Sequence, residues 1–135
     1  IMKAFVQKVL EKYPSFLREK AQFERHLEMR ENKEMRDALA MLKIKLGVVE
    51  SWFILLNVDE RFALRQALQF DQRNASAHCV AAMKWSWRLV KEGKSPWVLH
   101  EQALEKVASF SEKHKKAMEA IFDDEWHYGG TAHDE

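Results

Sequence analysis

Histidine and carboxylate side chains are the groups of this 135-residue chain that could do metal or acid–base chemistry. The six histidines lie far apart, and no two have the four-residue spacing of a zinc-binding helix. A di-iron carboxylate bundle needs Glu-x-x-His on two helices, and the chain contains no such sequence. His127 and His133 stand among acidic residues of the tail, but ligands on a glycine-rich backbone carry an ordering cost. The sequence therefore predicts no metal site.

Nucleophilic and cofactor chemistry are equally poorly supported. Cys79 is the single cysteine, and the neighbouring His78 points about 100° away from it on a helix, so the two cannot form a nucleophile–base pair. With four glycines, the chain has no loop to cradle a phosphate and no dinucleotide motif. We therefore predict a protein that is not an enzyme and has no cofactor. The lone cysteine favours a reducing, cytoplasmic location.

Tryptophan and basic residues gather in one stretch of the sequence. Residues two apart on a helix point about 200° apart, so Trp85 and Trp87 cannot both face the same core. We expect one to pack inward and the other to be at least partly exposed. An exposed indole beside cations can stack on a base or fill a pocket of a protein partner. The candidates for base or partner contacts are therefore Trp85, Trp87, Trp97 and His100.

A formal net charge of +1 conceals an uneven distribution. Residues 74–116 carry eight basic and four acidic groups, whereas residues 117–135 carry six acidic groups and no Lys or Arg. Such a tail keeps a domain soluble, folds back on the basic stretch or mimics nucleic acid. Phosphate contacts position a protein on nucleic acid without reading sequence. The predicted nucleic-acid-binding residues are Lys84, Arg88, Lys91, Lys94, Lys113, Lys115 and Lys116.

The elements that must position these residues are predicted to be helices. Glycine and proline are scarce, and apolar residues recur every three or four positions, which indicates an all-α, single-domain orthogonal bundle of about six helices. Tyr13-Pro14 ends the first helix, Asn57 and Glu60 form a capping box, and Gly93 ends the fifth helix. The expected helices span residues 2–12, 16–31, 35–53, 58–70, 77–91 and 96–122, the last with a bend near Ser109 and Ser111.

Residues 1–128 are expected to form one helical domain, and residues 129–135 a flexible tail. Within the domain, residues 1–56 are N-terminal helices and residues 57–128 a helix-turn-helix-like half. A homodimer that uses the apolar stripe from Met35 to Phe53 is compatible with this organisation. No apolar run is long enough to cross a membrane, so we expect no membrane partner.

Three fragments of the chain carry a family resemblance, and they are Lys8–Pro14, Leu42–Arg61 and Ala103–Ala108. They resemble RinA/ArpU-type phage transcriptional regulators, which have a sigma-region-4-like half. The resemblance implies a helix-turn-helix that binds promoter DNA near residues 75–105. Between Ser76 and Ala103, however, the family's turn has no clean counterpart, so the motif is expected to be degenerate.

Two functional hypotheses follow. The leading one is a phage or mobile-element regulatory protein that binds nucleic acid, DNA above all, through the basic tryptophan-containing region. The alternative is a small helical inhibitor or adaptor, for example a phage anti-defence protein, whose tryptophan face docks on a protein partner without catalysis. A steep salt dependence of DNA binding would favour the first.

Overall fold

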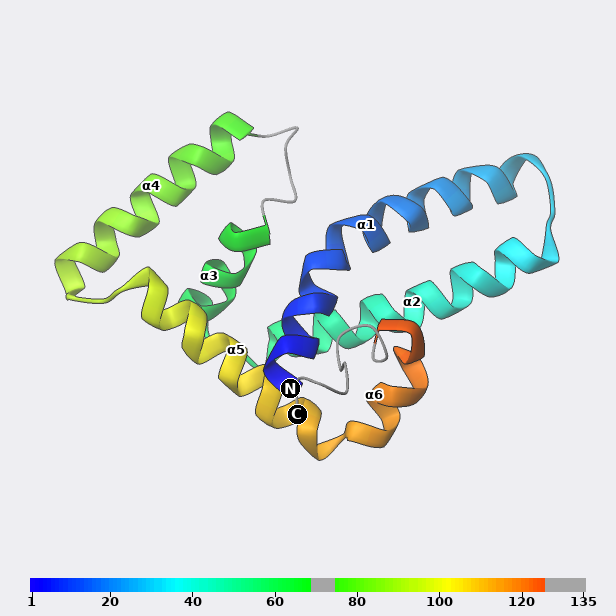
Figure 1. Ribbon diagram of the computed structural model, residues 1–135. Coiled ribbons are helices and arrows are strands. Elements are labelled where there is room, and N and C mark those ends of the chain that lie inside the picture. The colour runs from blue at the N-terminus through cyan, green and yellow to red at the C-terminus, as the bar shows by residue number, and fades with distance from the viewer. Residues whose placement is uncertain (69–74, 126–135) are drawn as a thin grey trace.

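The computed structural model describes residues 1–68 and 75–125, with residues 75–79 described by backbone alone. The described residues form helices and turns without a strand, which confirms the predicted all-α helical bundle. Figure 1 shows α1 (Met2–Met29) and α2 (Lys33–Ile54) as a long antiparallel pair, with α5 (Pro96–Lys113) crossing its base and α4 (Ala75–Glu92) lying away from it. None of the described helices has both the length and the apolarity of a membrane span.

The predicted break at Pro14 is wrong, because α1 continues through the proline. Proline inside a helix removes a backbone hydrogen bond and costs about 3 kcal/mol. Apolar side chains on both sides of it are buried against the rest of the bundle, and each contributes about 1.5–3 kcal/mol, so their burial outweighs the proline's cost. These side chains are Phe5, Val6, Val9, Leu10, Tyr13 and Phe16.

Helix α2 carries the long apolar stripe that the sequence predicts. It begins after Asn32, whose side chain accepts a hydrogen bond from the backbone N–H of Met35 at 3.1 Å. The buried side chains of α2 are Leu39, Leu42, Leu46, Val49, Trp52 and Phe53. All of them except Leu39 belong to the main core, together with side chains of α1, α5, α6 (Lys115–Ile121) and Phe122. The stripe proposed as a dimer interface is therefore buried within one chain, and that part of the prediction is wrong.

The capping box predicted before α3 (Val58–Leu68) is present. The backbone N–H of Glu60 donates to Asn57 Oδ1 at 2.8 Å, and the backbone N–H of Asn57 donates to Glu60 Oε1 at 3.0 Å. The predicted end of this helix at residue 70 lies outside the described residues. Helix α3 packs along α5 and also contacts α1.

Helix α4 ends where the sequence predicts. Gly93 has φ of +70°, and the Lys94 and Gly93 backbone N–H groups donate to the carbonyls of Leu89 and Val90. This is the glycine-terminated Schellman motif. The next helix, α5, begins as expected, because the Ser95 hydroxyl accepts from the Val98 N–H and proline stands at the first helical position. The predicted single helix over 96–122 is wrong, because it breaks at His114 between α5 and α6.

Two apolar clusters hold the fold together. The main core joins α1, α2, α5 and α6, so residues 1–56 and 57–128 share it. A smaller cluster of Ala63, Trp85, Leu89 and Leu99 attaches α4 to α3 and α5, with Phe62 packed against it. The predicted tail, residues 129–135, lies outside the described residues. Helix α4 is thus held by a few side chains on one side, and its opposite side faces away from the bundle.

Candidate functional site

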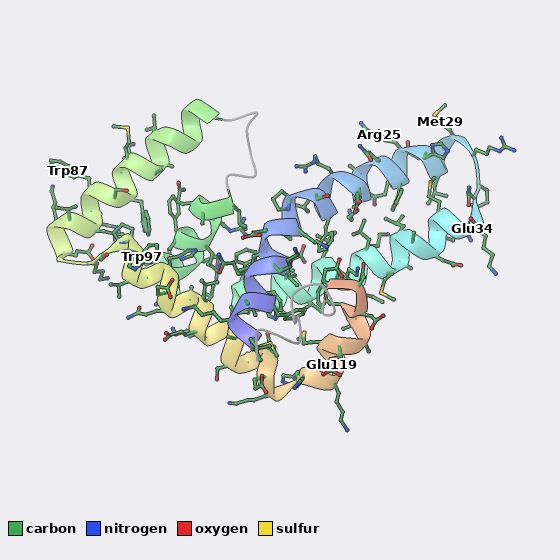
Figure 2. All side chains as sticks on the ribbon, in the orientation of Figure 1. Arg25, Met29, Glu34, Trp87, Trp97 and Glu119 are labelled. Carbon is green, nitrogen blue, oxygen red and sulfur yellow. The ribbon has the colours of Figure 1, made fainter. Side chains whose placement is uncertain are left out.

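The structure separates the two tryptophans of α4 as the sequence predicts. Trp85 is 9% exposed and its ring centroid lies 4.7 Å from that of Phe62. Trp87 is 67% exposed and points away from the bundle (Figure 2). Trp97 near the start of α5 is 71% exposed, and its ring stacks on His100 with centroids 6.3 Å apart. Trp87 and Trp97 are thus surface indoles, whereas Trp85 is part of the core.

Trp87 belongs to an apolar stripe along α4 that no other described element covers. Its members are 51–72% exposed, and they are Val80, Met83, Trp87 and Val90. Spacings of three, four and three residues place them on one side of the helix. We call these four residues the outer face of α4. Exposed apolar surface of this kind, beside a buried side formed by Trp85 and Leu89, is typical of an interaction surface.

A shallow hollow of about 360 Å³ lies within the outer face. It is lined by Ala82, Met83, Ser86, Trp87 and Val90. The short side chains of Ala82 and Ser86 leave room between the three bulky ones. The hollow is mostly apolar. It can accept one apolar side chain of a partner.

Two of the predicted phosphate-contacting residues instead bind acids of the same chain. Arg88 and Lys94 both contact Asp59 at the start of α3, the latter at 3.3 Å between Nζ and Oδ2. Trp85 Nε1 also donates to Asp59 Oδ1, at 3.2 Å. The hydrogen bond from Arg88 lowers the pKa of Asp59, with smaller contributions from Trp85 and Lys94. Glu92 takes a second contact from each cation, at 2.8 and 3.0 Å. Asp59 therefore fastens α4 to α3.

The remaining predicted cations lie in two groups. Lys84 and Lys91 are exposed on α4, and within the described part of the chain neither forms an ion pair. The Lys91 ammonium lies 5.7 Å from the centre of the Trp87 ring. The other group, Lys113, Lys115 and Lys116, lies at the end of α5 and the start of α6. The 18 residues of α5 separate the groups by about 27 Å of helix. The predicted set therefore does not form one continuous patch.

Two acids near the C-terminal end of the described residues, Asp124 and Glu125, pair with lysines of α1 and α2. Lys45 of α2 contacts Asp124 at 3.3 Å and Glu125 at 3.1 Å, and Lys12 of α1 contacts Glu125 at 3.6 Å. The hydrogen bond with Glu125 and the charge of Lys45 lower the pKa of Asp124 to about 2. The sequence analysis did not predict Lys45 as the partner of Asp124 and Glu125, because Lys45 lies about 80 residues away along the chain.

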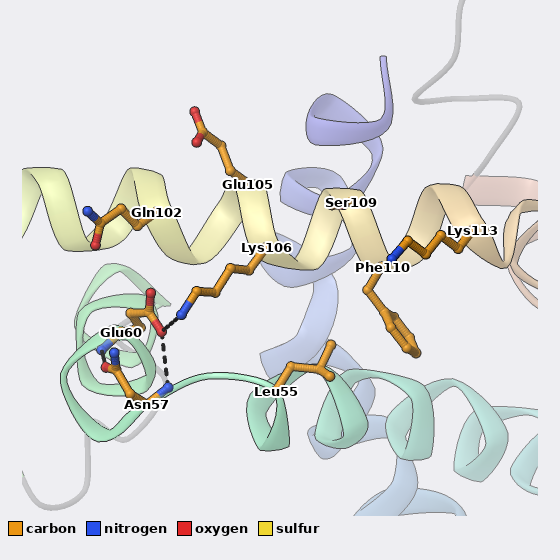
Figure 3. Close-up of a pocket in the computed structure, with 9 residues that line it drawn as sticks. All are labelled: Leu55, Asn57, Glu60, Gln102, Glu105, Lys106, Ser109, Phe110 and Lys113. Carbon is orange, nitrogen blue, oxygen red and sulfur yellow. Dashed lines mark hydrogen bonds and ion pairs between the residues drawn. The ribbon is translucent and has the colours of Figure 1, made fainter.

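A second concave surface lies between α5 and the corner that joins α2 to α3 (Figure 3). It encloses about 760 Å³. Glu60 lies there at 1% exposure and accepts a hydrogen bond from Lys106 at 2.7 Å, in addition to its capping bond. Because Lys106 already pairs with its charge, the role of Glu60 is to cap the start of α3. Leu55 and Phe110 supply apolar surface on opposite sides of this groove.

The described residues bring together no group of three or more His, Cys, Asp or Glu side chains that could hold a metal ion. His127 and His133 lie outside these residues, as does the side chain of Cys79. Comparison of the chain with protein-family models, with curated proteins and with solved structures finds no match.

Proposed function

We propose that this protein is a protein-binding module, an adaptor or inhibitor that acts without catalysis by seating an apolar-faced segment of another protein on the outer face of α4. The observation that carries the proposal is the exposure of Val80, Met83, Trp87 and Val90 as one stripe. Burying such side chains in a complex contributes about 1.5–3 kcal/mol each, which offsets the entropy lost on association. Tryptophan is also among the residues that dominate binding energy at protein interfaces.

Nucleic-acid binding remains a prediction with less support. Binding to a phosphate backbone grows with the number of unpaired cations on a common surface. Arg88 and Lys94 are engaged with Asp59 and Glu92, and the other predicted cations lie in two separate groups. An apolar stripe contributes nothing to phosphate contacts, whereas Trp and Met are among the residue types enriched at protein interfaces.

A selection from a displayed library of random peptides tests the proposal. We expect peptides that bind the wild-type protein and bind the Trp87→Ala variant at least about tenfold more weakly, a difference of about 1.4 kcal/mol. Met29→Ala is the matched control, because Met29 is 88% exposed on α1, away from α4. Circular dichroism verifies that both variants remain helical.

Two other results would overturn the proposal. One is the absence of any selected peptide whose binding depends on Trp87. The other is tight, strongly salt-dependent binding of duplex DNA that is lost on charge reversal of Lys113 and Lys116, which would establish the nucleic-acid hypothesis instead. Sedimentation equilibrium measures whether a second copy of the chain binds to the outer face of α4. A dimer that Trp87→Ala dissociates would replace the proposed partner by self-association.

A further inference from the structure

The outer face of α4 has the residue spacing of one strand of a coiled coil. Val80, Met83, Trp87 and Val90 follow one another at three, four and three residues, as the two apolar positions of successive heptads do. Their exposures of 51–72% show that no described element of the chain fills the role of the second helix. The face is therefore suited to another helix lying along α4.

The hollow on this face supports the same geometry. Four of its lining residues, Met83, Ser86, Trp87 and Val90, have the spacing i, i+3, i+4 and i+7. On a helix, that spacing encloses the diamond-shaped hole that receives one side chain of a facing helix. Because Ser86 is small, the hole is open. A strand would present side chains at a period of two and would not match the stripe over its length.

Charge beside the stripe selects the partner. Lys84 and Lys91 are seven residues apart, so they lie along the same flank of the outer face, one position after Met83 and Val90. Neither forms an ion pair within the described residues, unlike Arg88. In coiled coils these flanking positions pair with opposite charges of the facing helix. A partner with acidic residues on its flank would complete the pairing.

The same charges disfavour a second copy of this chain. In an antiparallel pair of α4 helices, Lys84 of one copy would face Lys91 of the other, so that like charges would meet. In a parallel pair Lys91 would face Ser86, which carries no charge to pair with it. Like charges at facing positions are destabilising and act against the wrong partner.

From these observations we infer that the partner segment is an amphipathic helix with an apolar heptad stripe and acidic flanks. This helix packs along α4 and inserts an apolar side chain between Met83, Trp87 and Val90. Its carboxylates pair with Lys84 and Lys91. This inference rests on the proposed function and names the chemistry of its partner. The acidic flank determines which helices bind, and the apolar stripe supplies most of the affinity.

Two synthetic peptides test the inference. Both are about three heptads long with leucine at the apolar positions, and they differ only in carrying glutamate or lysine at the flanking positions. Binding of each labelled peptide to the full chain is measured by fluorescence anisotropy. We expect the glutamate peptide to bind at least about tenfold more tightly than the lysine peptide. The double variant Lys84→Glu/Lys91→Glu should reverse this order, and Trp87→Ala should weaken both peptides.

The control is Lys113→Glu/Lys116→Glu, which changes the net charge equally at the far end of α5. Equal effects of the two double variants would overturn the inference, because net charge and not the flank of α4 would then set the preference. Trp87-dependent binding of both peptides with equal affinity would overturn the inference and leave the proposed function standing. Failure of the glutamate peptide to bind also overturns the inference, whereas the proposed function is tested separately, by the peptide selection and the DNA-binding measurement.

Discussion

At the scale of single residues, Asp59 determines how α4 is presented. Its carboxylate accepts hydrogen bonds from Trp85, Arg88 and Lys94, and its side chain is 15% exposed. It also lies in the first turn of α3, where the helix dipole stabilises a negative charge. Asp59 thus holds the buried indole and pairs with two cations, which leaves Lys84 and Lys91 as the cations of the described part of α4 without an ion pair.

The lowered pKa of Asp59 predicts a pH dependence. A carboxyl group whose pKa is lower in the folded than in the unfolded state stabilises the fold above the unfolded pKa. That contribution is lost as the pH falls through the folded pKa, below the ordinary value of 3.8. The indole N–H resonance of Trp85 should therefore shift with a midpoint below 3.8. The Asp59→Asn variant should lack this transition and show faster amide exchange in α4, by roughly tenfold. A midpoint at or above the ordinary value would contradict the arrangement.

At the scale of elements, helix ends and helix interiors respond differently to the same substitution. Gly47 lies inside α2 and Gly93 ends α4 with φ of +70°, and a Cβ added at either one meets no atom within 4 Å. The available space is therefore the same, and backbone conformation alone distinguishes the two glycines.

We predict opposite effects of alanine at these two positions. Gly47→Ala should raise the free energy of unfolding by about 0.5–1 kcal/mol, because alanine loses less backbone entropy in a helix. Gly93→Ala should lower it by about 1 kcal/mol, because alanine disfavours the left-handed conformation. Urea unfolding followed by circular dichroism measures both. Stabilisation by Gly93→Ala would show that α4 does not end in the Schellman motif.

At the scale of the whole molecule, the fold has a main core and a small outlying cluster. Leu104 lies in the main core at 2% exposure, and Leu89 lies in the cluster that attaches α4 at 0% exposure. The two leucines are equally buried, but they hold different parts of the chain together. Because separate clusters hold them, α4 can detach while α1, α2 and α5 remain packed.

Alanine substitution of each leucine should therefore destabilise a different part of the fold. Leu104→Ala should destabilise the whole fold by about 2–5 kcal/mol. Leu89→Ala should accelerate amide exchange throughout α4 while the amides of α2 keep their protection. Hydrogen exchange measured by mass spectrometry distinguishes the two patterns. Equal loss of protection in α2 for both variants would show that the fold unfolds as a single unit.

The local features of this protein were predictable from its sequence. The all-α class, the capping box of Asn57 and Glu60, the end of α4 at Gly93 and the opposite directions of Trp85 and Trp87 follow from interactions within a few residues. Such interactions depend on spacing and on side-chain type, which a sequence displays directly. The exposed indole of the candidate site was predictable for this reason.

Features that depend on contacts between distant segments could not be predicted from the sequence. The continuity of α1 through Pro14 follows from the burial of Tyr13 and Phe16 in the core. Asp59 pairs with cations 29 and 35 residues away, so that Arg88 and Lys94 of the predicted basic patch form ion pairs within the chain. These outcomes depend on which helices pack together, because burial and charge pairing are set by neighbours in space and not by neighbours in sequence.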